Sequence, residues 1–147
     1  MSTSNYTTTI VVDNSATEVF DAINNVQGWW QGAIEGSTDK LDDEFTYRME
    51  EIHFSKQKVI ELIPNKRIVW LVTDSMLNFT QDKSEWTGTK IIFDISELNK
   101  QTQLQFTHLG LVPAIECYGG CSGAWLQLIE QSLHSLITTG KGTMVFG

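Results

Sequence analysis

The chain has 147 residues, a length that lets one domain bury a core without help from a metal or from disulfides. Its 18 acidic and 10 basic residues give a formal net charge of -8, and no lysine or arginine cluster is present to neutralise phosphates. This charge balance disfavours nucleic acid and anionic membranes as partners.

The sequence also indicates where the protein resides. The longest apolar run, Ile68 to Val72, is much shorter than the roughly 20 residues of a membrane-spanning helix. The first residues have neither the basic nor the apolar segment of a signal peptide. Two cysteines, Cys117 and Cys121, are too few for a disulfide framework. We therefore expect residues 1–147 to form a single domain in the cytoplasm.

The N-terminal part of the chain is predicted to hold one strand and two short helices. The β-branched run YTTTIVV favours a strand, and NSATEVFDAIN follows it with Ser15 and Glu18 at the spacing of a capping box. Two glycines then bracket a second, very short helix that contains Trp29 and Trp30. A helix this short needs packing partners to be stable.

The middle of the chain, from Ala33 to Leu109, has the pattern of β-strands. Five runs are strand-like, namely FTYRM, KVIELI, RIVWLV, TKIIFDIS and TQLQFTHL. The shortest links between them are PNK and NKQ, in which proline and asparagine favour turns. This pattern predicts an antiparallel meander joined by hairpins.

The last third is predicted to be one long amphipathic helix from Glu116 to Thr139, ended by Gly140. Its two apolar stripes consist of Trp125, Leu128, Ser132 and Leu136, and of Leu126, Ile129, Leu133 and Ile137. The order of elements predicts an α+β fold in which a strongly bent antiparallel sheet wraps round this helix.

The start of the long helix is made of small residues. Cys117, Gly120, Cys121 and Ala124 share one helical face at positions i, i+3, i+4 and i+7. Their small size either leaves room for a ligand between helix and sheet or lets the helix lie directly on the sheet. Both interpretations stay open at this point.

His108 is the second candidate for a site. Strand alternation places it with Leu104 and Phe106 on the apolar face, so its imidazole either faces a ligand cavity or is satisfied by a backbone carbonyl at the strand end. His108, Cys117 and Cys121 could be drawn as a metal site, but the set lacks a fourth ligand and paired cysteines elsewhere. We predict no metal, no cofactor and two free thiols.

Catalytic motifs are missing from the sequence. It has no glycine-rich phosphate loop, no nucleophile elbow and no HExxH motif. Arg48, Glu50, His53 and His108 could include an acid or a base, but four residues of unknown direction do not make a catalytic arrangement. We predict no catalytic residue, although the sequence does not exclude an enzyme.

Several stretches resemble one known family. They are SATEVFDAINNVQGWW, PNKRIVWLVTDS, EWTGTKIIFDIS and TQLQFTHLGLVPAIECYGGCSGAWLQLIEQSLHSLITTGKG, which together span nearly the whole chain. The chain resembles the SRPBCC (START-like, helix-grip) superfamily, and within it the single-domain bacterial homologues of the activator of heat-shock-protein-90 ATPase. The resemblance implies a curved sheet that grips the C-terminal helix around a cavity for apolar molecules. Some members are cyclases or dehydratases, and others bind a chaperone.

We expect this chain to bind a small apolar or amphipathic molecule under the C-terminal helix. A protein-interaction or co-chaperone-like domain, with a chaperone or another protein as partner, is the first alternative, and a cofactor-free cyclase or hydrolase is the second. Of the adjacent tryptophans, we expect one in the core and the other near the cavity mouth or solvent, unless both simply pack the connector. The predicted ligand-binding residues are Trp29, Trp30, Trp70, Phe106, His108, Cys117, Tyr118, Gly120, Cys121 and Ala124.

Overall fold

The structure is a computed structural model that describes residues 5–30, 32–49, 53–77, 86–112 and 118–143. Within these ranges the strands form one antiparallel sheet in the order β1-β7-β6-β5-β4-β3-β2. The strands are β1 (Tyr6–Val12), β2 (Ala33–Gly36), β3 (Glu44–Met49), β4 (His53–Ile63), β5 (Arg67–Leu77), β6 (Lys90–Leu98) and β7 (Gln101–Leu109).

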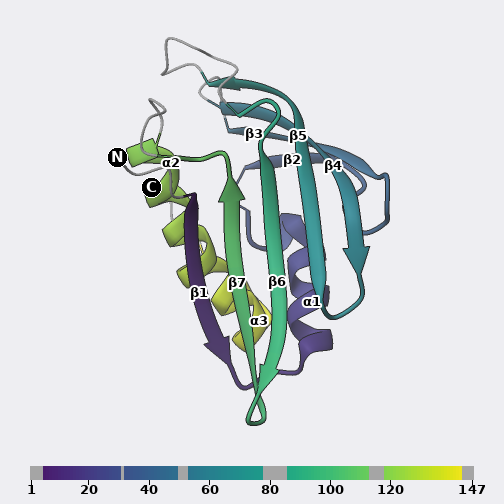
Figure 1. The fold of residues 1–147 in the computed structure, drawn as a ribbon, viewed down its shortest axis with the longest axis vertical. Coiled ribbons are helices and arrows are strands. Elements are labelled where there is room, and N and C mark those ends of the chain that lie inside the picture. The colour runs from purple at the N-terminus through teal and green to yellow at the C-terminus, as the bar shows by residue number, and fades with distance from the viewer. Residues whose placement is uncertain (1–4, 31, 50–52, 78–85, 113–117, 144–147) are drawn as a thin grey trace.

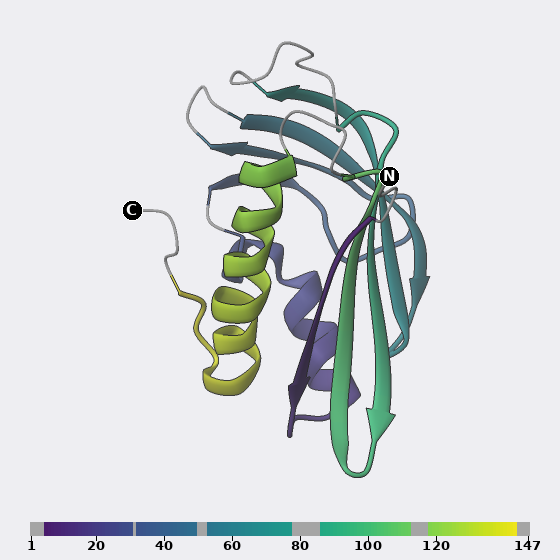
Figure 2. The same cartoon turned by 60° about the vertical axis from the view of Figure 1, so that its left-hand side comes forward.

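The helices lie together on the concave face of the curved sheet (Figure 1). Turning the molecule shows the C-terminal helix standing along that face, with α1 beside its lower half (Figure 2). The helical elements are α1 (Ala16–Asn24), the 3-10 turn η1 (Val26–Gly28), α2 (Tyr118–Gln127), the π-helical segment η2 (Leu128–Leu133) and α3 (His134–Thr139). This is the predicted helix-grip arrangement of an α+β fold.

Local sequence signals explain where several elements begin and end. The Ser15 side chain accepts a hydrogen bond from the Glu18 backbone while the Glu18 side chain accepts one from the Ser15 backbone, so the predicted capping box is present at the start of α1. Asn99 and Lys100, at φ of 48° and 71°, form the tight turn between β6 and β7. Gly140, at φ of 86°, ends α3 in the left-handed conformation that glycine adopts easily.

Two elements differ from the sequence prediction. The second short helix is only the turn η1, and Trp29 and Trp30 follow it instead of lying within it. Strand β2 was not predicted, because AIEG is only four residues long and shows no clear alternation. It pairs with β3 at one edge of the sheet.

The C-terminal helix is continuous from Tyr118 to Thr139 but not α-helical throughout. In the π-helical segment η2, the backbone takes more residues per turn than in α-helix. Leu126 of the predicted apolar stripe is 44% exposed, whereas Ile129, Leu133 and Ile137 of that stripe are buried. The two predicted stripes therefore do not continue straight along the helix.

The sheet bends most strongly across β4 and β5. Their pairing has register shifts between Lys56 and Gln57 and between Val59 and Glu61, and such bulges increase the local twist. Strand β5 pairs with β6 only as far as Leu71, although β5 itself continues to Leu77. Beyond that point β3, β4 and β5 reach across towards the start of α2 (Figure 2).

Between sheet and helices lies an aromatic core. Trp29 stacks at 6.4 Å from Trp70, and Trp70 meets Phe93 edge-on at 4.9 Å. The largest fully buried side chains are Trp29, Trp70, Trp125, Phe45, Phe93 and Phe106. Aromatic rings in these orientations each bury a large apolar area and stabilise one another further by roughly 0.5–1.5 kcal/mol per pair.

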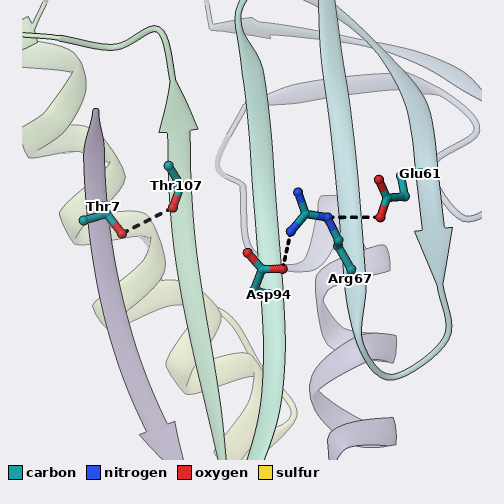
Figure 3. Close-up of polar contacts among 5 residues, drawn as sticks. All are labelled: Thr7, Glu61, Arg67, Asp94 and Thr107. Carbon is teal, nitrogen blue, oxygen red and sulfur yellow. Dashed lines mark hydrogen bonds and ion pairs between the residues drawn. The ribbon is translucent and has the colours of Figure 1, made fainter. Parts of the chain in front are cut away.

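The outer face of the sheet carries polar cross-strand pairs instead (Figure 3). Arg67 of β5 binds Asp94 of β6 through Nη1 at 2.6 Å and Glu61 of β4 through Nε at 3.0 Å. The hydroxyls of Thr7 and Thr107 lie 3.3 Å apart between β1 and β7. Because these groups are partly exposed, we assign them to strand pairing and not to a site.

Candidate functional site

A cavity of about 160 Å³ lies where β3 and β4 approach the first turns of the C-terminal helix. The sheet contributes Tyr47, Met49 and His53, and the loop before β6 contributes Trp86. The remaining wall residues are Trp30 after η1 and Gly120, Cys121, Ala124, Trp125 and Leu128 on the helix. Because Gly120 is exposed while the other helical residues lie deeper, the mouth of the cavity is at the start of α2.

The small helical residues leave free space beneath the helix. A Cβ atom added at Gly120, which lines the cavity, would meet no heavy atom of the described residues within 4 Å. A helix that rested directly on the sheet would place sheet atoms within this distance. Of the two interpretations of the small-residue face, the structure therefore favours open space over direct contact.

The walls of the cavity are mostly aromatic. Trp30 stacks on Tyr47 with ring centroids 4.0 Å apart and meets Trp125 at 5.0 Å. Trp86 lies roughly parallel to Trp125 at 5.8 Å and contacts His53 edge-on at 4.5 Å. Burial raises the pKa of the Tyr47 hydroxyl, which is therefore protonated at neutral pH.

His108 is hydrogen-bonded to the wall residue Trp125 directly and to the wall residue Trp86 through Thr89. Trp125 Nε1 donates a hydrogen bond to His108 Nδ1 at 3.0 Å, and His108 Nε2 lies 2.8 Å from Thr89 Oγ1. Thr89 Oγ1 donates its one hydrogen to the Trp86 carbonyl at 2.5 Å, so it accepts from His108. His108 is therefore neutral, with its proton on Nε2, and both of its ring nitrogens are used.

Burial lowers the pKa of both histidines of this region. The pKa of His53 falls to about 4. That of His108, which is completely buried, falls to about 3 because of burial and the neighbouring His53. A proton on His108 Nδ1 would also face the Trp125 N–H, which is itself a donor. Both side chains are neutral at neutral pH.

These pKa values predict that mild acid destabilises the protein. Between pH 6.5 and 4 the histidines bind protons in the unfolded chain but not in the folded one, so the free energy of unfolding decreases as pH falls. We expect a loss on the order of a few kcal/mol between pH 7 and 5. Urea unfolding at several pH values measures it, and a flat profile over this window would contradict the burial of neutral histidines.

Comparisons with known proteins identify the family. The model of the family described as "Activator of Hsp90 ATPase homolog 1-like protein" matches residues 13–138. The chain belongs to this family. The resemblance seen in the sequence is thereby confirmed. No curated protein sequence matches the chain.

Solved structures share the fold of this family member over most of its length. The solution structure of the Aha1 dimer from Colwellia psychrerythraea is 25% identical, with a TM-score of 0.75, and the match covers 95% of this chain and 99% of that one. Protein SSP2350 from Staphylococcus saprophyticus is 15% identical with a TM-score of 0.68, over 97% and 98% of the two chains. Protein Mll3558 from Rhizobium loti is 17% identical with a TM-score of 0.67, over 86% and 92%.

The residues predicted to bind a ligand fall into three groups according to their place in this family member. Trp30, Gly120, Cys121 and Ala124 line the cavity. Trp29, Trp70, Phe106 and His108 are buried in the core outside the cavity wall, and Tyr118 packs against the edge of that core. Cys117 lies outside the described residues, so the state of the cysteine pair stays a prediction.

The adjacent tryptophans are both buried, each at 2% exposure. Trp29 Nε1 donates to the Ile23 carbonyl at 3.1 Å, and the Trp29 carbonyl accepts from Ser132 Oγ at 2.7 Å. Trp29 thus ties α1 to the C-terminal helix, while Trp30 turns to the cavity. The expectation of one core residue and one near the cavity agrees with these positions, but neither side chain reaches solvent.

Sequence reasoning did not assign several wall residues to the ligand site. Tyr47 and Met49 share one face of β3 with Phe45, because every second residue of a strand points the same way, and this period-2 signal could have indicated them. Trp125 and Leu128 were placed on an apolar stripe, and their spacing from Cys121 could have linked them to the small-residue face. Trp86 precedes β6 in a turn, where no periodic signal exists.

The candidate acid and base residues do not assemble into a catalytic site among the described residues. His53 lines the cavity, whereas Arg48 is exposed and lies over the Phe54 ring at 4.8 Å. Glu50 lies outside the described ranges. Among the described wall residues there is no carboxylate or cationic side chain that could act with His53. No cluster of metal-ligating side chains occurs in the described part of the chain either.

Proposed function

We propose that this protein binds a small apolar or amphipathic molecule in the cavity between its sheet and its C-terminal helix. The observation that carries the proposal is the open space beneath Gly120, bounded by aromatic side chains. Glycine in a helix destabilises it by up to about 1 kcal/mol relative to alanine. Gly120 in the first turns of α2 is therefore unfavourable for folding, and a ligand entrance gives it a use.

The size of the cavity limits the ligand. A comparable apolar cavity of about 150 Å³, engineered into another protein, binds benzene. The cavity here, about 160 Å³ and open on one side, therefore accommodates a single ring, and the mouth beside Gly120 lets a substituent extend towards solvent. The wall is dominated by aromatic and other apolar side chains, which suits a molecule that is uncharged where it is buried.

Native mass spectrometry of protein purified from its own host tests this function. We expect a bound small molecule that is released on denaturation. The same preparation of a Gly120→Leu variant should carry none, because the leucine would occupy the cavity. The proposal would be overturned if wild-type protein purified from its host carried no ligand and also bound no small apolar compound in titrations.

A co-chaperone-like role is the second candidate, and the family match supports it. The match to the Aha1 structure from Colwellia psychrerythraea extends over nearly the full length of both chains. Contact with Hsp90 would use an outer surface and would leave the cavity unexplained. Capture of Hsp90 by the purified protein, with unchanged capture by the Gly120→Leu variant, would favour this role over ligand binding. Either role is compatible with the cytoplasm, the location that we propose.

The described residues contain no helix that is long and apolar enough to cross a membrane.

A further inference from the structure

His53 is the histidine of the described cavity wall. Its surroundings on β4 are unusually polar for a buried face of a strand. His53, Ser55 and Gln57 alternate on the concave side of the strand, and both Ser55 and Gln57 are completely buried. Buried polar side chains are normally retained only where each finds a hydrogen-bond partner. These three residues bond to one another in a row.

The hydrogen atoms in this row can be assigned. Gln57 Nε2 donates to Ser55 Oγ at 2.5 Å, and Ser55 Oγ lies 3.3 Å from His53 Nε2. A serine hydroxyl has one hydrogen, and with the Gln57 amide turned so that Nε2 faces Ser55 and Oε1 has no partner among the described residues, His53 Nε2 is the acceptor left for it. Ser55 therefore donates to His53 Nε2. Since His53 is neutral, its own proton is then on Nδ1.

This tautomer leaves His53 with an available donor. Nδ1 makes no hydrogen bond to any residue in the described part of the chain, and His53 is partly exposed in the cavity wall. The rings of Tyr47 and Trp86 meet it edge-on at 5.1 and 4.5 Å and restrict its rotation. A donor held in this way in an apolar cavity is available to an acceptor that the ligand brings.

We propose that His53 is the polar recognition point of the cavity, and that the ligand class is a neutral ring compound with a hydrogen-bond acceptor, such as a carbonyl, next to its ring. The inference rests on the proposed ligand-binding function and deepens it. The aromatic walls take the ring, and His53 Nδ1–H donates to the acceptor. Ser55 is a positioning residue, because it fixes the tautomer without touching the ligand.

Two probes of the same shape test this assignment. Acetophenone and α-methylstyrene are similar in size and differ only in a carbonyl oxygen against a methylene group. Titration of each into wild-type protein and into His53→Phe gives a ratio of affinities for each protein. We expect the preference for acetophenone over α-methylstyrene to fall by about 10-fold in His53→Phe, the effect of one donor that loses its acceptor. Binding of α-methylstyrene itself should persist.

The outcomes separate the two proposals. If neither probe binds wild-type protein at the cavity residues, the ligand-binding function fails. If both bind and the ratio is the same in His53→Phe, the function stands and the role of His53 is wrong. Ser55→Ala provides a second readout that does not depend on His53→Phe folding. It should lower the same ratio and shift the His53 ¹⁵N resonances away from the Nδ1–H tautomer. An unchanged tautomer would overturn the part assigned to Ser55.

Discussion

Replacing Gly120 with leucine is expected to abolish the binding of small apolar molecules while the protein stays folded. The leucine side chain projects from a wall position into space that holds no other heavy atom near the added Cβ. Filling that space removes the room for a ligand. Loss of a helical glycine contributes up to about 1 kcal/mol of added stability. Thermal unfolding and titration with α-methylstyrene, followed by NMR, measure the two effects.

Gly123→Leu is the matched control for this experiment. Gly123 lies in the same helix, is exposed, and has open space around an added Cβ, but it does not line the cavity. It should gain similar stability and keep its affinity for the probe. A large fall in melting temperature for Gly120→Leu alone would mean that the helix lies against the sheet. Wild-type affinity in Gly120→Leu would mean that the probe binds elsewhere.

His108→Phe is expected to destabilise the protein by about 2–4 kcal/mol, although phenylalanine keeps a ring of similar shape. The substitution leaves the buried Trp125 N–H without its acceptor, which costs about 1–3 kcal/mol, and removes one hydrogen bond of about 1 kcal/mol from the partly buried Thr89 hydroxyl, which still donates to the Trp86 carbonyl. Because His108 no longer titrates, the loss of stability between pH 7 and 5 should also be smaller. Urea unfolding of the variant at both pH values provides the two measurements.

His134→Phe serves as the control for this variant, since His134 is partly exposed on α3 and donates no side-chain bond within the described residues. Its effect should stay within about 0.5 kcal/mol. A His108→Phe protein as stable as wild type would show that the hydrogen bonds behind the cavity wall contribute little. It would also remove the reason for assigning the acid sensitivity to His108.

The elements that sequence predicted well are those whose signals are local. The capping box of Ser15 and Glu18, the turn at Asn99 and Lys100, and the glycine after α3 each depend on a few neighbouring residues. The long helix and the meander follow from period alone. These features, together with the resemblance, were enough for the helix-grip fold.

The candidate site was predictable only in part, because a cavity wall depends on which layer a side chain occupies. Alternation correctly placed His108 on the inner face of β7, yet Trp86 and Trp125 pack against it and both line the cavity. His53 could not be assigned a direction, because Ser55 to Lys58, which follow one residue later on β4, are polar on both faces. Which of the two histidines lines the cavity depends on distances across the fold, and spacing along the chain does not give these distances.

The π-helical segment has a consequence for comparing related chains. A π-helical turn accommodates one residue more than an α-helical turn, so Leu128–Leu133 corresponds to a one-residue insertion in an otherwise regular helix. Before this segment α2 contributes most of the helical cavity residues, within it Ser132 bonds to the Trp29 carbonyl, and after it α3 contacts α1. A homologous chain that lacks this residue would turn one half of its helix by about 100° relative to the other. A gap of one position at this point in an alignment therefore marks a chain with a different set of side chains around its cavity.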